Sequence, residues 1–137
     1  MNLSDELKRR DIKIGWLFWI VGALFYCYTI ANRIFPSLIS HKLMSSLHIN
    51  AGEFGLLSAS FYLSYTIMQV PVGFLVDRYD IRRVLSLACL SLLLGELVFI
   101  YSENLATAIM GRFIMGIGGG FSYVAALKLA AVWLPKE

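Results

Sequence analysis

Three ionisable residues, Arg33, Glu96 and Arg112, interrupt long apolar stretches of the sequence. A charged side chain at membrane depth is costly, so such residues usually face protein or water and mark solute or ion pathways. A guanidinium in a low-dielectric setting favours a carboxylate or phosphate, which it binds through paired hydrogen bonds. For Arg33, a position near the helix end also allows the alternative that it reaches the outer headgroups.

Glu96 has three interpretations. A hairpin turn is expected near Glu103. Glu96 lies seven residues before Glu103, and Arg112 lies nine residues after Glu103. At about 1.5 Å per residue the two side chains have similar depths, so they could form a buried ion pair. Alternatively, Glu96 is a proton-coupling site, or a carboxylate that reaches the membrane surface.

Polar residues follow helical spacing around these charges. The three stripes are Tyr26, Thr29 and Arg33; Ser58, Tyr62, Tyr65 and Gln69; and Arg112, Gly116, Gly119 and Tyr123. Each stripe marks one face of an otherwise apolar helix. We expect the stripes to meet around a polar cavity that suits the passage of a polar solute.

The composition places the chain in a membrane. Of 137 residues, 58% are hydrophobic and 15% are charged, against roughly 45–50% and about 25% in soluble domains. The charges cluster in residues 5–13 and 77–83. A soluble enzyme, a nucleic-acid binder and a disulfide scaffold are excluded, and no residue cluster predicts catalysis, a cofactor or a metal.

Apolar length predicts four membrane spans, at about 20 residues each. They cover about 14–35, 54–76, 84–101 and 105–134, an all-α polytopic bundle between a cytoplasmic segment, 1–13, and a tail, 135–137. Asn50 and Glu53 form a capping signal before the second span. Pro36 and Pro135 are expected to end the first and fourth.

The basic residues predict the orientation. Eight lie on one side of the expected membrane and one, Lys42, on the other; the eight are Lys8, Arg9, Arg10, Lys13, Arg78, Arg82, Arg83 and Lys136. Because cytoplasmic loops carry an excess of Lys and Arg, we expect a multi-pass protein of the cell membrane with both termini in the cytoplasm.

Glycines cluster in the fourth span, at Gly116, Gly118, Gly119 and Gly120. Small residues let membrane helices approach closely, and Gly55 with Ala59 predicts a second such contact. Bending of the helix is the alternative, and we favour packing.

A charged turn joins the second and third spans. Its residues are Gly73, Asp77, Arg78, Asp80, Arg82 and Arg83. A carboxylate at a helix C-terminus is unfavourable, so Asp77 needs a partner: one of the three arginines or the N-terminus of another helix. Such a charge set would make a breakable cytoplasmic latch.

This turn resembles the signature loop of the major facilitator superfamily, Gly-x-x-x-Asp-Arg/Lys-x-Gly-x-Arg/Lys-Arg/Lys. Asp80 replaces the glycine of the pattern, and we expect a left-handed backbone there, which Asp adopts more readily than most residues. Arg112-x-x-x-Gly116-x-Gly118 is similar to the family's fourth-helix pattern.

The subgroup is indicated by fewer residues. Met115 stands where proton-coupled antiporters tend to have glutamine, which disfavours drug efflux. Gln69, Pro71 and the segment Trp133-Leu-Pro-Lys-Glu137 are similar to members that import organic anions.

The resemblance implies alternating-access transport of a small polar solute, with a proton or sodium as coupling ion. The subgroup resemblance implies that this solute is an organic anion. It implies that the turn locks one state, and that a solute path is lined by Arg33, Tyr62, Tyr65, Gln69, Arg112 and Tyr123. Glu96 is the candidate for proton coupling.

A complete member has about twelve spans in two halves, so four spans predict a piece of a longer transporter that does not carry solute without the remainder. One alternative is a four-span exporter that acts as a dimer. Such an exporter would need a membrane-embedded carboxylate in the first span, and residues 14–35 contain none. The other is a non-transporting membrane subunit, which leaves the charged turn and the polar stripes unexplained.

Overall fold

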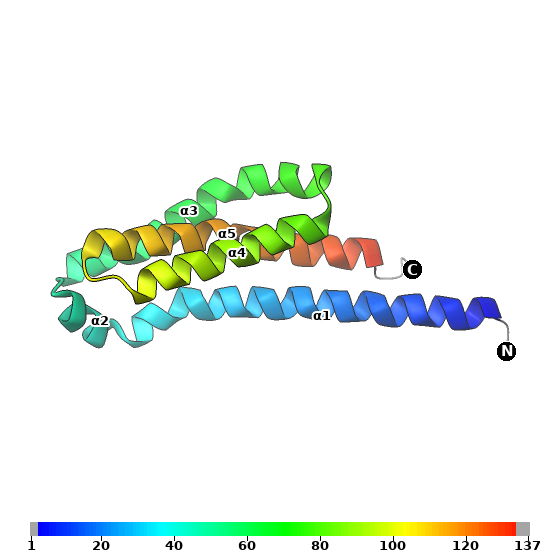
Figure 1. The fold of residues 1–137 in the computed structure, drawn as a ribbon, viewed down its shortest axis with the longest axis horizontal. Helices are drawn as coiled ribbons and strands as arrows, with labels where there is room; N and C mark the ends of the chain where they lie inside the picture. Colours follow the sequence, from blue (N-terminus) through cyan, green and yellow to red (C-terminus); the bar gives the residue numbers. More distant parts are fainter. Residues whose placement is uncertain (1–2, 134–137) are drawn as a thin grey trace.

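The computed structural model describes the backbone of residues 3–133 and the side chains of residues 15–17, 19–124 and 128. The expected tail at 135–137 lies outside the described residues, as does Pro135. Within them the secondary structure is entirely helical (Figure 1). The helices are α1 (Leu3–Leu38), α2 (Ser40–Leu47), α3 (Ala51–Arg78), α4 (Ile81–Ile100) and α5 (Leu105–Trp133).

Four of these helices are long and apolar enough to cross a membrane. The segments that meet this condition are Gly15–Leu38, Ala51–Arg78, Ile81–Ile100 and Leu105–Val124. The prediction of an all-α polytopic membrane bundle is therefore confirmed, and the chain is a multi-pass membrane protein.

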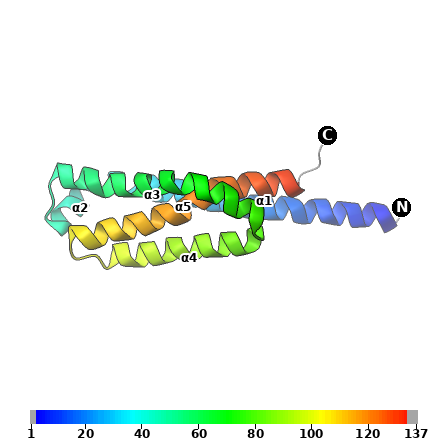
Figure 2. The same ribbon diagram turned by 90° about the horizontal axis from the view of Figure 1, so that it is seen from above.

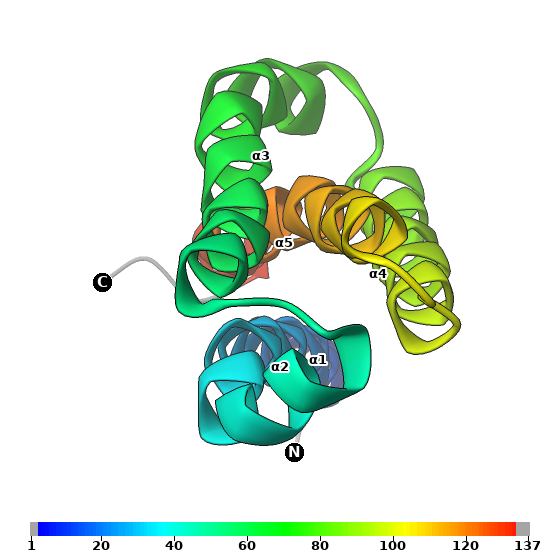
Figure 3. The same cartoon turned by 90° about the vertical axis from the view of Figure 1, so that its left-hand side faces the viewer.

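The helix α5 occupies the centre of the bundle. It runs between α3 and α4 when the molecule is seen from above (Figure 2), and the end view shows α1 beneath the three (Figure 3). By contrast α3 and α4, which a short turn joins, make few contacts with each other. The bundle is therefore held together through α5.

Glycines allow the close approach of α5 to its neighbours. A Cβ added at Gly118 would lie 2.6 Å from the carbonyl oxygen of Ala88 on α4. One added at Gly116 would overlap the Ser64 hydroxyl and the Phe61 carbonyl on α3. Gly119 and Gly120 also face α3. The helix contact predicted at Gly55 is not found among the described residues, since nothing lies within 4 Å of a Cβ added there.

Two helix boundaries differ from the expectations. The helix α1 continues past Pro36 to Leu38, because proline removes one hydrogen bond of the last turns without preventing them. The connection after it, expected as a loop, contains α2, which ends at His48 in a left-handed conformation (φ 53°). At α3 the predicted capping box of Asn50 and Glu53 is confirmed.

Candidate functional site

Arg112 is buried in the bundle with 1% of its surface exposed. Its Nη1 donates a hydrogen bond to the main-chain oxygen of Asn32 on α1, at 2.9 Å. That oxygen is free because the residue four positions later is Pro36, which has no N–H to give it. The proline thus creates the acceptor that α1 offers to Arg112.

Aromatic rings surround the guanidinium of Arg112. Its Cζ lies 4.7 Å from the centroid of Phe61 on α3 and 5.9 Å from that of Phe99 on α4. Both distances lie within the range of cation–π attraction. These contacts tie the charge of α5 to α3 and α4, while Asn32 ties it to α1.

Arg33 reaches α3 in the same way. Its Cζ lies 4.6 Å from the centroid of Tyr65, 5.4 Å from Tyr62 and 5.9 Å from Phe61. Phe61 is therefore within cation–π distance of both arginines, one from α1 and one from α5. The site brings together four of the residues predicted for the solute path: Arg33, Tyr62, Tyr65 and Arg112.

Both arginines retain unsatisfied hydrogen-bonding capacity. Their Nε atoms are buried without an acceptor, and among the described residues neither arginine forms an ion pair. A buried donor without an acceptor costs free energy, and the cost is larger on a charged group. An anionic acceptor brought to this place would therefore be bound strongly.

Glu96 on α4 has partners on α1. Its Oε1 accepts hydrogen bonds from the Tyr28 hydroxyl and from Asn32 Nδ2, the latter at 2.9 Å. Within the described residues it forms no ion pair with Arg112. Asn32 connects the two instead, since its side chain binds Glu96 and its carbonyl binds Arg112.

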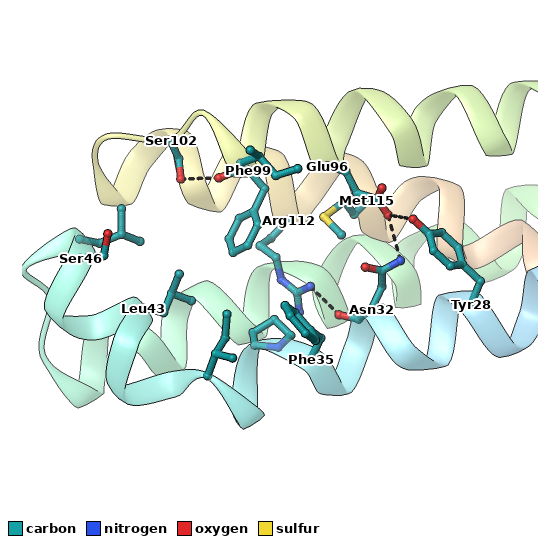
Figure 4. A pocket seen from close by; sticks show the side chains of 14 residues that line it. Tyr28, Asn32, Phe35, Leu43, Ser46, Glu96, Phe99, Ser102, Arg112 and Met115 are labelled. Atoms are coloured by element: carbon teal, nitrogen blue, oxygen red, sulfur yellow. Dashed lines mark hydrogen bonds between the residues drawn. The ribbon is translucent and has the colours of Figure 1, made fainter.

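A cavity of about 440 Å³ adjoins Arg112 and Glu96 at this end of the bundle (Figure 4). Its wall comes from α1, α2, α4, α5 and the residues beside them: Tyr28, Asn32, Phe35, Pro36, Ile39, Leu43, Ser46, Leu47, Glu96, Phe99, Ile100, Ser102, Arg112 and Met115. Of the residues predicted for the solute path, Arg112 lines this cavity.

The other residues of the polar stripes lie elsewhere. Tyr123 is partly exposed on α5 and packs its ring against Tyr26 of α1, with centroids 5.6 Å apart. Gln69 is half-buried on α3, one turn beyond Tyr65. Arg33, Tyr65, Gln69 and Tyr123 do not line the cavity beside Arg112.

The charged turn lies at the opposite end of α3. Asp77 pairs with Lys128 of α5 at 3.2 Å, and the same ammonium donates to the carbonyl of Val76. A cation is favourable at a helix C-terminus, where carbonyls lack partners. Lys128 therefore pairs with the Asp77 carboxylate and also binds a carbonyl oxygen near the C-terminal end of α3. It was not among the partners of Asp77 expected from the sequence.

Asp80 begins the next helix instead of completing a left-handed turn. Its φ of −59° and ψ of 124° make the expected left-handed backbone wrong. The side chain accepts a hydrogen bond from the Arg82 amide at 3.1 Å and caps α4. Arg78 lies over the ring of Phe74 at 5.5 Å, and Arg83 is exposed. Nothing lies within 4 Å of a Cβ at Gly73.

Sequence reasoning missed Tyr28, Asn32 and Lys128. The position of Pro36, four residues after Asn32, was a usable signal for a free carbonyl inside the first span. Tyr28 and Lys128 gave no such signal, because their partners lie 68 and 51 residues away in the sequence.

These features define a class of protein: a polytopic helical bundle that keeps unpaired positive charge in its apolar interior. The sequence-family model described as Major Facilitator Superfamily matches residues 12–137. The chain belongs to this superfamily.

The relatives are longer proteins. The chain is 30% identical to the "Uncharacterized transporter YybO" of Bacillus subtilis (strain 168), over 98% of this chain and 31% of the relative. It is 31% identical to the "Putative multidrug resistance protein MdtD" of Pectobacterium atrosepticum, over 77% and 22%. It is 25% identical to the "Probable sulfoacetate transporter SauU" of Cupriavidus necator, over 97% and 30%. The chain thus spans less than a third of each, and no solved structure gives a significant match.

Proposed function

We propose that the chain is part of a longer secondary transporter that carries an organic anion across the cell membrane by alternating access. The observation that supports this is the buried Arg112 with an unpaired Nε and no carboxylate partner among the described residues. An acidic solute would supply the missing acceptor through a charge-assisted hydrogen bond. Arg33, whose Cζ lies 5.9 Å from the centroid of the same Phe61 ring, adds a second positive charge near the site.

The remaining predicted site residues receive roles under this proposal. Tyr62 and Tyr65 hold Arg33 through their rings, and Gln69 and Tyr123 extend the path along α3 and α5. Glu96 is the candidate for proton coupling, because it lines the cavity with Arg112 and is joined to it through Asn32. A proton or sodium is the coupling ion.

The charged turn serves as the cytoplasmic latch in this proposal. The pair of Asp77 and Lys128 is solvent-exposed on the carboxylate side, so water can replace it at small cost. The latch residues are Gly73, Asp77, Arg78, Asp80, Arg82 and Arg83, and both termini lie in the cytoplasm.

The names of the relatives support a role in transport, but they indicate different solutes. SauU is named for sulfoacetate, an organic anion, and MdtD for multidrug resistance. The uncompensated positive charge favours the anion for this chain, because a neutral or cationic drug would bring no negative charge to either arginine.

Uptake by the complete transporter in proteoliposomes tests the proposal. A panel of radiolabelled short organic acids that includes sulfoacetate should reveal an acid whose uptake falls by about 100-fold in Arg112→Gln, equal to roughly 2.7 kcal/mol. Lys42→Gln removes an exposed positive charge from α2 and should leave uptake unchanged. Equal uptake by Arg112→Gln and the unsubstituted protein would contradict the proposal.

A further inference from the structure

The lining of the cavity beside Arg112 is mainly apolar, with a few polar and charged side chains among it. In Figure 4, Tyr28, Asn32 and Glu96 lie on one side of Arg112, and Leu43 and Ser46 of α2 lie on the other. Phe35, Ile39, Leu47 and Phe99 contribute rings and aliphatic chains to the lining. A mainly apolar lining that includes one buried cation suits a ligand with a charged end and an apolar body.

Arg112 is the positively charged residue among those that line the cavity. The residue is buried, its Nη1 is occupied by the Asn32 carbonyl, and its Nε has no acceptor. A carboxylate or sulfonate oxygen beside this guanidinium would satisfy the remaining donor and offset the charge. Arg112 is therefore the residue at which the acidic end of a ligand would bind.

Glu96 would repel an acid if its carboxylate faced the same space. Two donors, the Tyr28 hydroxyl and Asn32 Nδ2, hold its Oε1 toward α1. These bonds spread its negative charge onto α1, and Figure 4 shows the trio on the far side of Arg112 from α2. Glu96 lines the same cavity, so an acid would bind with its charged group on the α2 side of Arg112, away from this carboxylate.

We infer that the solute is an organic acid with an apolar body. Its acidic group binds Arg112, and its body lies along Phe35, Phe99 and the leucines of α2. The volume of about 440 Å³ falls within the roughly 300–1,000 Å³ of small-molecule pockets. The inference rests on the proposed function, because it takes Arg112 as the residue that binds the acid.

Calorimetric titration of the complete transporter in phosphatidylcholine nanodiscs tests this inference. The probes are acetate, butyrate and hexanoate, with hexanamide as the neutral analogue of the longest acid. Affinity should rise about fourfold for each added methylene, the factor that burial of one CH₂ group provides. Hexanamide should bind far more weakly than hexanoate, because it cannot offset the charge of Arg112.

Phe35→Ala removes part of the apolar lining and should lower the gain in affinity per methylene, measured as the ratio of hexanoate to acetate affinity. Leu47→Ala should act in the same direction. Phe74→Ala is the matched control, since Phe74 is as exposed as Phe35 and does not line the cavity. Equal affinity for acetate and hexanoate, or an unchanged gain in Phe35→Ala, would overturn the inference.

The two proposals fail in different ways. Acid binding that depends on Arg112 but not on chain length refutes the apolar body and leaves the anion site standing. Binding of hexanamide as tight as that of hexanoate, unaffected by Arg112→Gln, refutes the acid itself and the proposed function with it.

Discussion

Charged side chains are buried at one end of the bundle and exposed to solvent at the other. At the arginine end, defined by Arg33, Phe61 and Arg112, positive charge is held against aromatic rings and Arg112 is 1% exposed. At the loop end, defined by Asp77, Asp80 and Lys128, the carboxylate of Asp77 is 84% exposed and pairs with an amine.

This difference separates two kinds of interaction. Charge kept inside protein without an opposite charge retains a large free energy that a ligand can release. An exposed ion pair contributes about 0–1 kcal/mol and breaks readily. The arginine end is therefore suited to binding, and the loop end to a contact that forms and breaks during a conformational cycle.

The largest expected effect comes from Phe61, the ring that is within cation–π distance of both arginines. It is fully buried, so Phe61→Ala should lower the free energy of unfolding by about 3–5 kcal/mol through the cavity it leaves. The measurement is thermal unfolding of the purified protein in detergent. Phe74→Ala, at an exposed phenylalanine toward the loop end, should change stability little, and equal losses would contradict the comparison.

Glycines at the two ends should differ in the same direction. Gly116→Ala should cost about 1–3 kcal/mol, because the new Cβ meets the main chain of α3 at Phe61. Gly73→Ala should leave the unfolding midpoint nearly unchanged, since its Cβ would enter open space. A comparable loss in both variants would show that α5 does not depend on close approach to α3.

A smaller effect is expected from the hydroxyl pair that joins α1 to α5. Thr29 and Ser122 share a buried hydrogen bond at 3.0 Å, and polar bonds between membrane helices average about 0.6 kcal/mol. Thr29→Val should therefore lower the unfolding midpoint slightly. The effect should be absent when Ser122→Ala is already present, as a double-mutant cycle would measure.

The smallest effect belongs to the loop end. Asp77→Asn should change stability by less than about 1 kcal/mol, because the carboxylate is largely solvated. The difference in stability between Asp77→Asn and the unsubstituted protein should be smaller still in 1 M salt, where the Debye length is about 3 Å. A loss comparable to that of Phe61→Ala would remove the distinction between the two ends.

The sequence predicted the elements better than their contacts. Apolar length and charge position predicted four membrane-length helices, and the spacing of Asn50 and Glu53 predicted a cap. These features depend on neighbours in the chain. The partner of Asp77 could not be found in this way, because Lys128 reaches it only through the path of α5 past the end of α3.

The candidate site shows the same division. Periodicity identified Arg33, Tyr62, Tyr65 and Arg112, which the structure brings together, because a polar stripe on a membrane helix turns toward protein. It could not show that Asn32 stands between Arg112 and Glu96. That position depends on which carbonyl a proline frees and on how deep each helix sits.

The central place of α5 has a consequence for biosynthesis. Because α3 and α4 make few contacts with each other, the hairpin of these two neighbours has little to hold it as a unit. The contacts that hold α3 and α4 in one bundle can therefore form only after α5 has left the translocation machinery. The contacts of Arg33 with Tyr62 and Tyr65 need only α1 and α3, so they can form earlier.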